Sequence, residues 1–283
     1  MIVETVHPLV RRVLAPNPSP FTNTGTQTHI VGAGEPGSEV AVIDPGPDIA
    51  EHVAAILAAT QGQRVVAIVC THTHRDHTPA AASLAAATGA PVVGCAPIPA
   101  REGSGLEAGF DHSYAPDRIM VEGDSVSGPG WTLEAIATPG HTSNHLCFAL
   151  PEANALFSGD HVMGWSTSVV VPPDGDMGAY LASLEKLLAR DDEVYFPAHG
   201  DPVTKPQRLV RGMIGHRRQR ESQILKLLGE GPRSVPEMVA AMYVGLDPRL
   251  TPAAGASVLA HLIDLRSRGR IAEDEDVWTL VAA

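Results

Sequence analysis

The chain is poor in aromatic and basic residues, and it lacks a long apolar run. Phe, Trp and Tyr make up 4% of its 283 residues, so the core has to be built from Ala, Val, Leu and Ile. Twenty Lys and Arg against 32 Asp and Glu give a net charge of −12, which argues against indiscriminate binding to nucleic acid or an anionic membrane. The sequence contains no run of about 18 apolar residues, so no transmembrane helix is predicted.

Cysteine is also scarce. Cys70, Cys95 and Cys147 lie in apolar runs and show no C-x-x-C spacing, which is typical of reduced thiols in a core. The first residues lack the basic and apolar stretches of a signal peptide. These features together predict a cytoplasmic protein with no membrane association.

Against this background, one loop is unusually rich in metal-ligand residues. The segment T-H-T-H-R-D-H contains His72, His74, Asp76 and His77, and it directly follows the apolar run 65–70. Imidazole and carboxylate groups are ligands for zinc and similar metals. A polar loop with chance histidines is the alternative, but the clustering favours a metal site beyond the end of a buried strand.

Three further ligand-type residues follow predicted strands in the second half of the chain. His141 follows the strand 131–138, Asp160 follows 155–157, and His199 follows 193–196. Each is next to a glycine, which lets the backbone approach a metal cluster without a Cβ in the way. Strand ends are where α/β folds usually place their sites.

The rest of residues 1–205 reads as alternating strands and helices. Strands are predicted at 10–14, 29–31, 40–43, 65–70 and 91–95, with helices at 49–60, where Asp48 is the N-cap, and from Thr78-Pro79 to 88. Residues 98–118 are predicted to form a loop that borders a substrate cleft.

The pattern changes from about residue 206. Helices are predicted at 209–228, 235–243 and 255–268, followed by a hairpin around the acidic turn 273–276. Three helices and a hairpin resemble a winged-helix module. We therefore predict two domains, at 1–205 and 206–283. The run Arg217-Arg218-Gln219-Arg220 is expected to be a solvated helix face, with a phosphate-binding patch as the alternative.

The motifs T-H-T-H-R-D-H, P-G-H-T, S-G-D and A-H-G, in this order, resemble the metallo-beta-lactamase superfamily. The resemblance implies an αββα sandwich with a dinuclear metal site, followed here by a small C-terminal winged-helix-like domain. It implies that His72, His74 and His141 bind one metal and Asp76, His77 and His199 the other. Asp160 would bridge the two. Two Zn²⁺ ions are the default, with iron or manganese as alternatives.

The implied activity is hydrolysis of an ester-type bond by a metal-bridged hydroxide, with Asp76 and Asp160 as the catalytic residues that orient it. Some antibiotic-hydrolysing members carry Cys where this chain has Asp160, so thioesters, lactones or phosphodiesters are the expected substrates. The sequence leaves the chemical identity of the leaving group open. A thiolate leaves without an acid, which favours a small-molecule thioester or activated ester.

The motif H-T-S-N-H from His141 and the tail after residue 206 narrow the resemblance to the beta-lactamase-like protein two family. That family implies a second candidate substrate, single-stranded RNA, cut by an endoribonuclease. Residues 21–29 resemble a stretch near its active site, with Gln27 replacing Asn and His29 replacing Tyr. A non-catalytic metal-binding regulator that binds DNA through the winged helix is the alternative of another class, and a homodimer through the tail is a further one.

Overall fold

A computed structural model describes residues 3–100 and 109–281. The chain divides into two compact units. The first unit comprises 1–138, 144–166 and 191–206, and the second comprises 139–143, 167–190 and 207–283. The predicted boundary between residues 205 and 206 stays a prediction.

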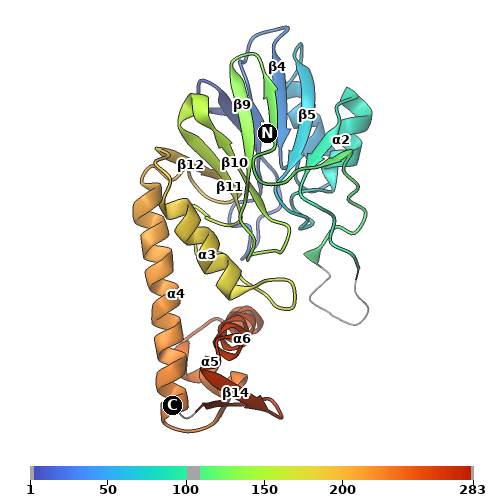
Figure 1. The fold of residues 1–283 in the computed structure, drawn as a ribbon. Coiled ribbons are helices and arrows are strands. Elements are labelled where there is room, and N and C mark those ends of the chain that lie inside the picture. Colours follow the sequence, from blue (N-terminus) through green and yellow to red (C-terminus); the bar gives the residue numbers. More distant parts are fainter. Residues whose placement is uncertain (1–2, 101–108, 282–283) are drawn as a thin grey trace. The chain divides into compact units, whose positions relative to one another are not determined.

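A seven-stranded sheet forms one half of the first unit (Figure 1). Its strands, in spatial order, are β1 (Val3–His7), β2 (Val10–Leu14), β3 (Gln27–Val31), β4 (Glu39–Ile43), β5 (Arg64–Cys70), β6 (Val92–Gly94) and β7 (Arg118–Ile119). Neighbours are antiparallel from β1 to β4 and parallel from β4 to β7. The parallel strands β4 and β5 therefore end at the same edge of the sheet.

Two helices of the first unit accompany this sheet. They are α1 (Ala50–Ala59), which contacts β2, and α2 (Ala80–Thr88), which contacts β5 and β6. The side chains of Ile56 in α1 and Leu84 in α2 are fully buried in the main core. Helix α2 begins after Pro79 and ends at Gly89, whose φ of 71° gives the left-handed C-cap that glycine favours.

A five-stranded sheet forms the other half of the first unit. Its order is β12 (Val194–Pro197), β11 (Ala155–Gly159), β10 (Leu146–Leu150), β9 (Trp131–Ala137) and β8 (Ser125–Gly128). Only the pair β11–β12 is parallel in this sheet. The segments after β11 and β12 therefore leave the sheet at the same edge.

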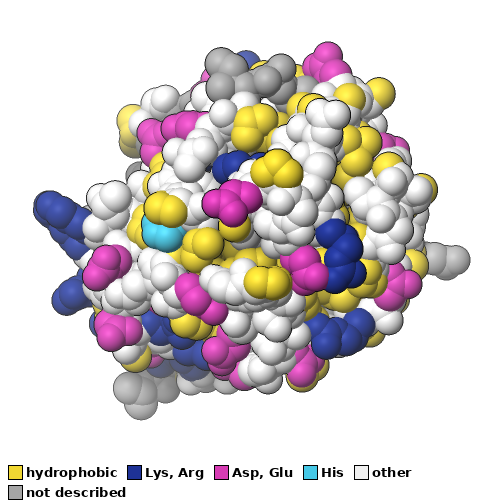
Figure 2. Space-filling model, turned by 90° about the horizontal axis from the view of Figure 1, so that it is seen from above, with side chains coloured by type: hydrophobic (Ala, Val, Ile, Leu, Met, Phe, Trp, Pro, Cys, Tyr) yellow, Lys and Arg dark blue, Asp and Glu magenta, His cyan; other side chains and the backbone are white. Residues whose placement is uncertain are grey.

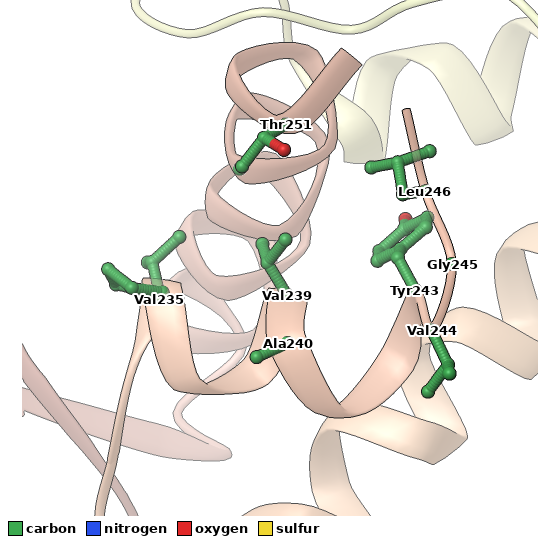
Figure 3. Close-up of a pocket in the computed structure, with 10 residues that line it drawn as sticks. Val235, Val239, Ala240, Tyr243, Val244, Gly245, Leu246 and Thr251 are labelled. Atoms are coloured by element: carbon green, nitrogen blue, oxygen red, sulfur yellow. The ribbon is translucent and has the colours of Figure 1, made fainter. Parts of the chain in front are cut away.

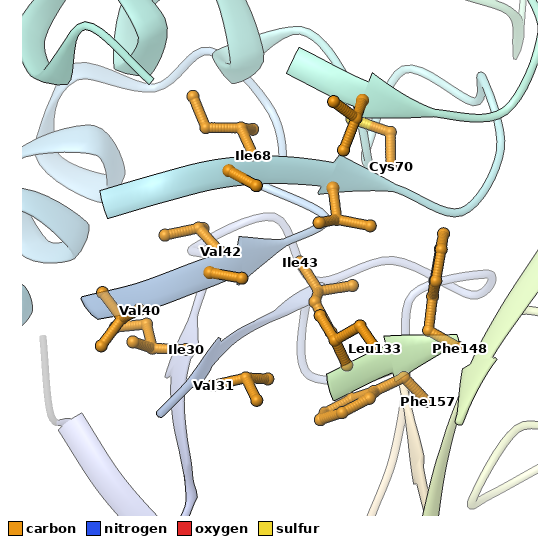
Figure 4. Close-up of a cluster of buried hydrophobic side chains, with 14 of the residues drawn as sticks. Ile30, Val31, Val40, Val42, Ile43, Ile68, Cys70, Leu133, Phe148 and Phe157 are labelled. Carbon is orange, nitrogen blue, oxygen red and sulfur yellow. The ribbon is translucent and has the colours of Figure 1, made fainter. Parts of the chain in front are cut away.

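The two sheets share one hydrophobic core (Figure 4). Ile30, Val42 and Ile68 come from the seven-stranded sheet, and Leu133 and Phe157 come from the five-stranded sheet. Burial of each such side chain stabilises the fold by roughly 1.5–3 kcal/mol. Aliphatic residues dominate this core, as the scarcity of aromatics predicted. The three cysteines are buried free thiols.

The second unit contains four helices and a small sheet. The helices are α3 (Met177–Leu188), α4 (Pro206–Gly229), α5 (Val235–Met242) and α6 (Thr251–Ser267). The antiparallel sheet has the order β13 (Arg233–Ser234), β15 (Val277–Leu280) and β14 (Ile271–Asp274). Trp278 is buried in the core of this unit, with the guanidinium carbon of Arg266 5.5 Å from its ring centroid.

An apolar cavity of about 560 Å³ lies between α5 and α6 (Figure 3). Val239 and Ala240 of α5 line it, together with Tyr243, Leu246 and Thr251. Nothing charged faces it among its lining residues. The cavity therefore suits an apolar group.

The predicted elements are confirmed to within a few residues, with two kinds of exception. Asp48 is not the N-cap of α1: Ile49 takes that position without a side-chain cap, and the carboxylate of Asp48 accepts a hydrogen bond from Ser83 instead. The sequence also gave no indication of β1, β7, β8 and β13, which are short or exposed. Part of the predicted loop 98–118 falls at 101–108, outside the described residues.

Candidate metal centre

The ends of three strands bring six of the seven predicted ligands together in the first unit. His72, His74, Asp76 and His77 follow β5, Asp160 follows β11, and His199 comes two residues after β12. Asp160 and His199 emerge side by side because β11 and β12 are parallel, with Gly159 opposite Pro197. The two halves of the motif, which are far apart in the sequence, thus converge at one edge.

The first group of ligand atoms comes from His72, His74 and Asp160, which lie within 4.8 Å of one another. His72 Nε2 is 3.0 Å from His74 Nδ1, and the two rings are nearly perpendicular at 82°. The other nitrogen of the buried His72 ring is 3.0 Å from the hydroxyl of Thr71. The two imidazoles therefore aim nitrogen atoms at a common point.

The second group consists of Asp76, His77 and His199, also within 4.8 Å of one another. Asp76 Oδ2 is 3.3 Å from His77 Nε2 and 3.2 Å from His199 Nε2. Ligand atoms around a tetrahedral cation with bonds of about 2.1 Å would be about 3.4 Å apart. His77 Nε2 is buried and makes no hydrogen bond within the described residues. The spacing and this buried nitrogen both fit a divalent cation.

Asp160 is shared between the two groups. Its Oδ1 lies 3.2 Å from His199 Nε2 and 3.6 Å from His77 Nε2, while the residue also belongs to the group with His72 and His74. A carboxylate with two oxygen atoms can face two cations at once. Its place between the groups is the geometry that a bridging ligand requires.

The electrostatics of the site favour a positive charge. Burial lowers the pKa of His199, but the charge of Asp160 and hydrogen bonds to both carboxylates outweigh it and raise the pKa to about 10. Burial raises the pKa of Asp76, but His77 and His199 more than offset this and hold it well below its usual range. The same field that stabilises a buried imidazolium stabilises a metal cation in its place.

Asp44 orients His77 from behind. It directly follows β4, the strand beside β5, and its Oδ2 accepts a hydrogen bond from His77 Nδ1 at 3.0 Å. Thr71 donates to the same carboxylate from its backbone N–H and from its hydroxyl, both at 2.8 Å. With the proton fixed on Nδ1, Nε2 carries the lone pair that a metal needs. Asp44 was not among the predicted site residues, although it follows the strand parallel to β5.

Residues 25–27 make further contacts to the second group and its neighbours. Thr26 donates its hydroxyl to Asp76 Oδ2 at 3.1 Å, and His199 Nδ1 lies 3.3 Å from the carbonyl of Gly25. Gln27 binds both neighbours of His199: its N–H donates to the Ala198 carbonyl at 2.8 Å, and its side-chain amide donates to the Gly200 carbonyl. The resemblance placed this stretch near the site, but it did not give these contacts.

His145 has a positioning role toward Asp160. Its Nδ1 lies 2.9 Å from the hydroxyl of Thr138, and its Nε2 accepts a hydrogen bond from the Asp160 backbone N–H at 3.2 Å. Simple packing would not require these contacts. The hydrogen bonds favour positioning. His161 is buried, with its ring centroid 5.7 Å from that of His145.

His141, the seventh predicted ligand, lies in the segment 139–143, which belongs to the second unit. Its Nδ1 donates to the carbonyl of Val169 at 2.6 Å and lies 3.2 Å from the hydroxyl of Ser168. In this tautomer Nε2 carries the lone pair. Histidines that bind metals usually donate the other ring N–H to a carbonyl or carboxylate in this way.

A cavity of about 730 Å³ adjoins the second group through Gly200, the residue after His199. Its walls include Leu14, Pro16 and Trp165, and Arg12 and Gln27 are among its polar lining residues. Trp165 is 41% exposed. The cavity offers a mainly apolar surface beside the ligands.

Comparison with known proteins agrees with this geometry. Residues 26–199 match the family described as the metallo-beta-lactamase superfamily, and residues 234–278 match the beta-lactamase associated winged helix domain. An atrochrysone carboxyl ACP thioesterase from Cryptosporiopsis sp. is 31% identical over 262 residues, covering 85% of this chain and 74% of that protein. A beta-lactamase-like protein 2 homolog from Drosophila melanogaster is 30% identical over 282 residues, covering 93% and 89%.

Solved structures share the fold. A beta-lactamase domain protein from Burkholderia ambifaria superposes with a TM-score of 0.80 at 19% identity, over 99% of this chain and 93% of that chain. A protein solved in a di-iron-bound form has a TM-score of 0.54 at 30% identity, over 69% and 95%. The predicted alpha/beta sandwich with a C-terminal winged-helix domain is confirmed. None of the described helices is long and apolar enough to cross a bilayer. The chain belongs to the metallo-beta-lactamase superfamily, and it is a metal-dependent hydrolase with a beta-lactamase-associated winged-helix domain.

Proposed function

We propose that this protein hydrolyses thioesters of a small acyl group, using two divalent cations. The observation that carries the proposal is the position of Asp160, whose carboxylate belongs to one group of ligand atoms and lies 3.2 Å from His199 of the other. His72, His74 and His141 would hold the first cation, and Asp76, His77 and His199 the second. Asp160 would contact both.

Bound divalent cations supply Lewis-acid chemistry: they polarise a substrate oxygen and make water a nucleophile at neutral pH. Zinc is the default occupant because nitrogen and oxygen donors suit it, and iron or manganese are alternatives. The di-iron-bound relative supports iron as an alternative. The chain itself supplies orientation, since Thr26 and His199 hold Asp76, and His145 holds the backbone of Asp160.

Asp76 and Asp160 are the residues proposed to orient the attacking water. The side chain of Asp76 is 26% exposed, against 10% for Asp160. Asp76 therefore has room to accept a hydrogen bond from water on its open side. No described residue near the ligands is an obvious acid for the leaving group. A thiol with a pKa of about 8.5 leaves as a thiolate without one, which supports a thioester over an alkyl ester.

The relatives named as ACP thioesterases support the same bond type. The cavity beside Gly200 is proposed to receive the apolar acyl group, with Trp165 and Leu14 as its contact surface. An RNA substrate has less support, because in the arginine run of α4 Arg217 is buried and Arg218 pairs with Glu185. Figure 2 also shows a face on which Lys and Arg side chains are interspersed with Asp and Glu, rather than gathered into a basic stripe.

The test is a substrate panel on zinc-loaded protein: acyl thioesters, lactones, a phosphodiester and a labelled single-stranded RNA. We expect thioester hydrolysis, and we expect Asp160→Ala to reduce it by at least about 100-fold. Asp191→Ala, an exposed carboxylate, is the matched control and should leave the rate unchanged. Cleavage of RNA but of no thioester would replace this proposal with the endoribonuclease alternative.

A further inference from the structure

Three arginines in one turn of α4 have three different environments. Arg218 is exposed and pairs with Glu185 at 2.9 Å, and the guanidinium of Arg220 lies 4.5 Å from the ring centroid of Tyr243. Arg217 is only 3% exposed. The expectation of a solvated helix face is therefore wrong for Arg217, whose side chain does not share the exposed surface of Arg218.

Arg217 is buried without an acidic partner. No Asp or Glu among the described residues forms an ion pair with it. Its guanidinium lies 5.3 Å from the ring centroid of Tyr180, and its Nη1 is 3.4 Å from the hydroxyl of Ser257. A buried charge without a counter-ion is costly, so it needs compensation from hydrogen bonds to neutral groups.

A further contact of Arg217 goes to the loop that accepts the hydrogen bond of His141. Nη2 of Arg217 donates to the backbone carbonyl of Ser168. The hydroxyl of Ser168 lies 3.2 Å from His141 Nδ1, and the next carbonyl, that of Val169, accepts the His141 Nδ1–H at 2.6 Å. A charge-assisted hydrogen bond thus fixes the peptide directly before the one whose carbonyl orients the imidazole.

We propose that Arg217 is a positioning residue for His141. It fixes the Ser168–Val169 peptide and thereby the position of the adjacent Val169 carbonyl, which holds the proton of His141 on Nδ1 and leaves the lone pair on Nε2 for a cation. This inference rests on the proposed function, in which His141 is a metal ligand. It gives the long helix before the winged-helix domain a part in building the metal site.

The first test uses Arg217→Met, which keeps much of the volume and removes the charge and donors. Metal-free protein is titrated with Zn²⁺ in competition with a chromophoric chelator. The affinity for one of the two ions should fall 10- to 100-fold, the range usual for loss of a group that orients a ligand. Arg218→Met, the exposed neighbour, is the control and should bind Zn²⁺ like the wild type. An unchanged affinity in Arg217→Met would overturn the inference.

Non-additivity separates positioning from a general loss of stability. If Arg217 acts through His141, the double variant Arg217→Met/His141→Ala should bind Zn²⁺ no more weakly than His141→Ala. Additive losses would contradict the inference. If His141→Ala itself binds both ions normally, the proposed function fails and this inference fails with it. If His141→Ala loses an ion while Arg217→Met does not, only this inference fails.

The tautomer of His141 gives a readout that needs neither metal nor activity. In metal-free protein labelled with ¹⁵N-histidine, long-range ¹H–¹⁵N spectra should place the proton of wild-type His141 on Nδ1. Arg217→Met should show a mixture of tautomers. Should Arg217→Met fail to fold, Arg217→Lys carries the same test, because it keeps the charge but cannot keep both guanidinium contacts. A pure Nδ1–H tautomer in the folded variant would overturn the inference.

Discussion

Asp44→Asn is expected to change the tautomer of His77, a predicted metal ligand, without replacing the ligand itself. Asp44 is buried and sits at a φ of 47°, a left-handed conformation that Asn tolerates well, so the backbone should not change. The backbone N–H of Thr71 needs an oxygen at the Oδ1 position. The new amide nitrogen then takes the Oδ2 position, opposite His77 Nδ1.

An amide N–H facing Nδ1 reverses the hydrogen bond. His77 must then accept at Nδ1, so its proton moves to Nε2, the atom that faces Asp76 at 3.3 Å. A protonated Nε2 cannot bind a metal. We expect the affinity for the second ion to fall 10- to 100-fold, which corresponds to about 1.4–2.7 kcal/mol.

The assay is a Zn²⁺ titration of metal-free protein against a chelator, with bound zinc counted by mass spectrometry. The variant should retain close to one ion under conditions in which the wild type retains two. Asp48→Asn, an exposed carboxylate that accepts from Ser83, is the matched control and should retain both. Two ions bound to Asp44→Asn with wild-type affinity would refute the tautomer argument.

Three further substitutions have expected outcomes. Gln27→Ala removes the side-chain bond beside His199 and should weaken Zn²⁺ binding several-fold in the chelator titration. Burial, together with the nearby charge of Arg217, lowers the pKa of His261 to about 3. The neutral form of His261 therefore contributes stability above pH 6.5, and this contribution is lost as the pH falls toward 3. Between pH 8 and pH 5 the wild type should therefore lose about 2 kcal/mol more than His261→Gln in urea unfolding. Leu133→Ala should cost about 2–5 kcal/mol in the same assay.

The grouping of the predicted ligands could be anticipated from the sequence, because each of them follows a recognisable strand. Periodicity and turn residues locate a strand end, and parallel neighbours bring strand ends together. That reasoning put Asp160 and His199 at strand ends, and the family resemblance joined them with the 72–77 loop, where the structure brings their ligand atoms together. The allocation of each ligand to one ion stays a prediction from the resemblance.

The supporting residues were not predictable in the same way. Asp44, Gln27 and Arg217 act through hydrogen bonds to segments 27 to 173 positions away in the sequence. No local pattern marks such a contact: Asp44 reads as a turn residue and Arg217 as a surface charge. Asp48 shows the reverse case, a good N-cap residue whose carboxylate is taken by Ser83 of another helix. In all four residues, the contacts of the side chain are set by partners that are distant in the sequence and not by local conformational propensity.

The count of bound metal together with thioester hydrolysis tests the central claim most directly. Zinc-loaded wild-type protein should carry two ions per chain and hydrolyse an acyl thioester, and Asp160→Ala should lose at least one ion and nearly all hydrolysis. A wild-type protein that is fully active with a single ion, or an Asp160→Ala variant that keeps both ions and its rate, would contradict the account.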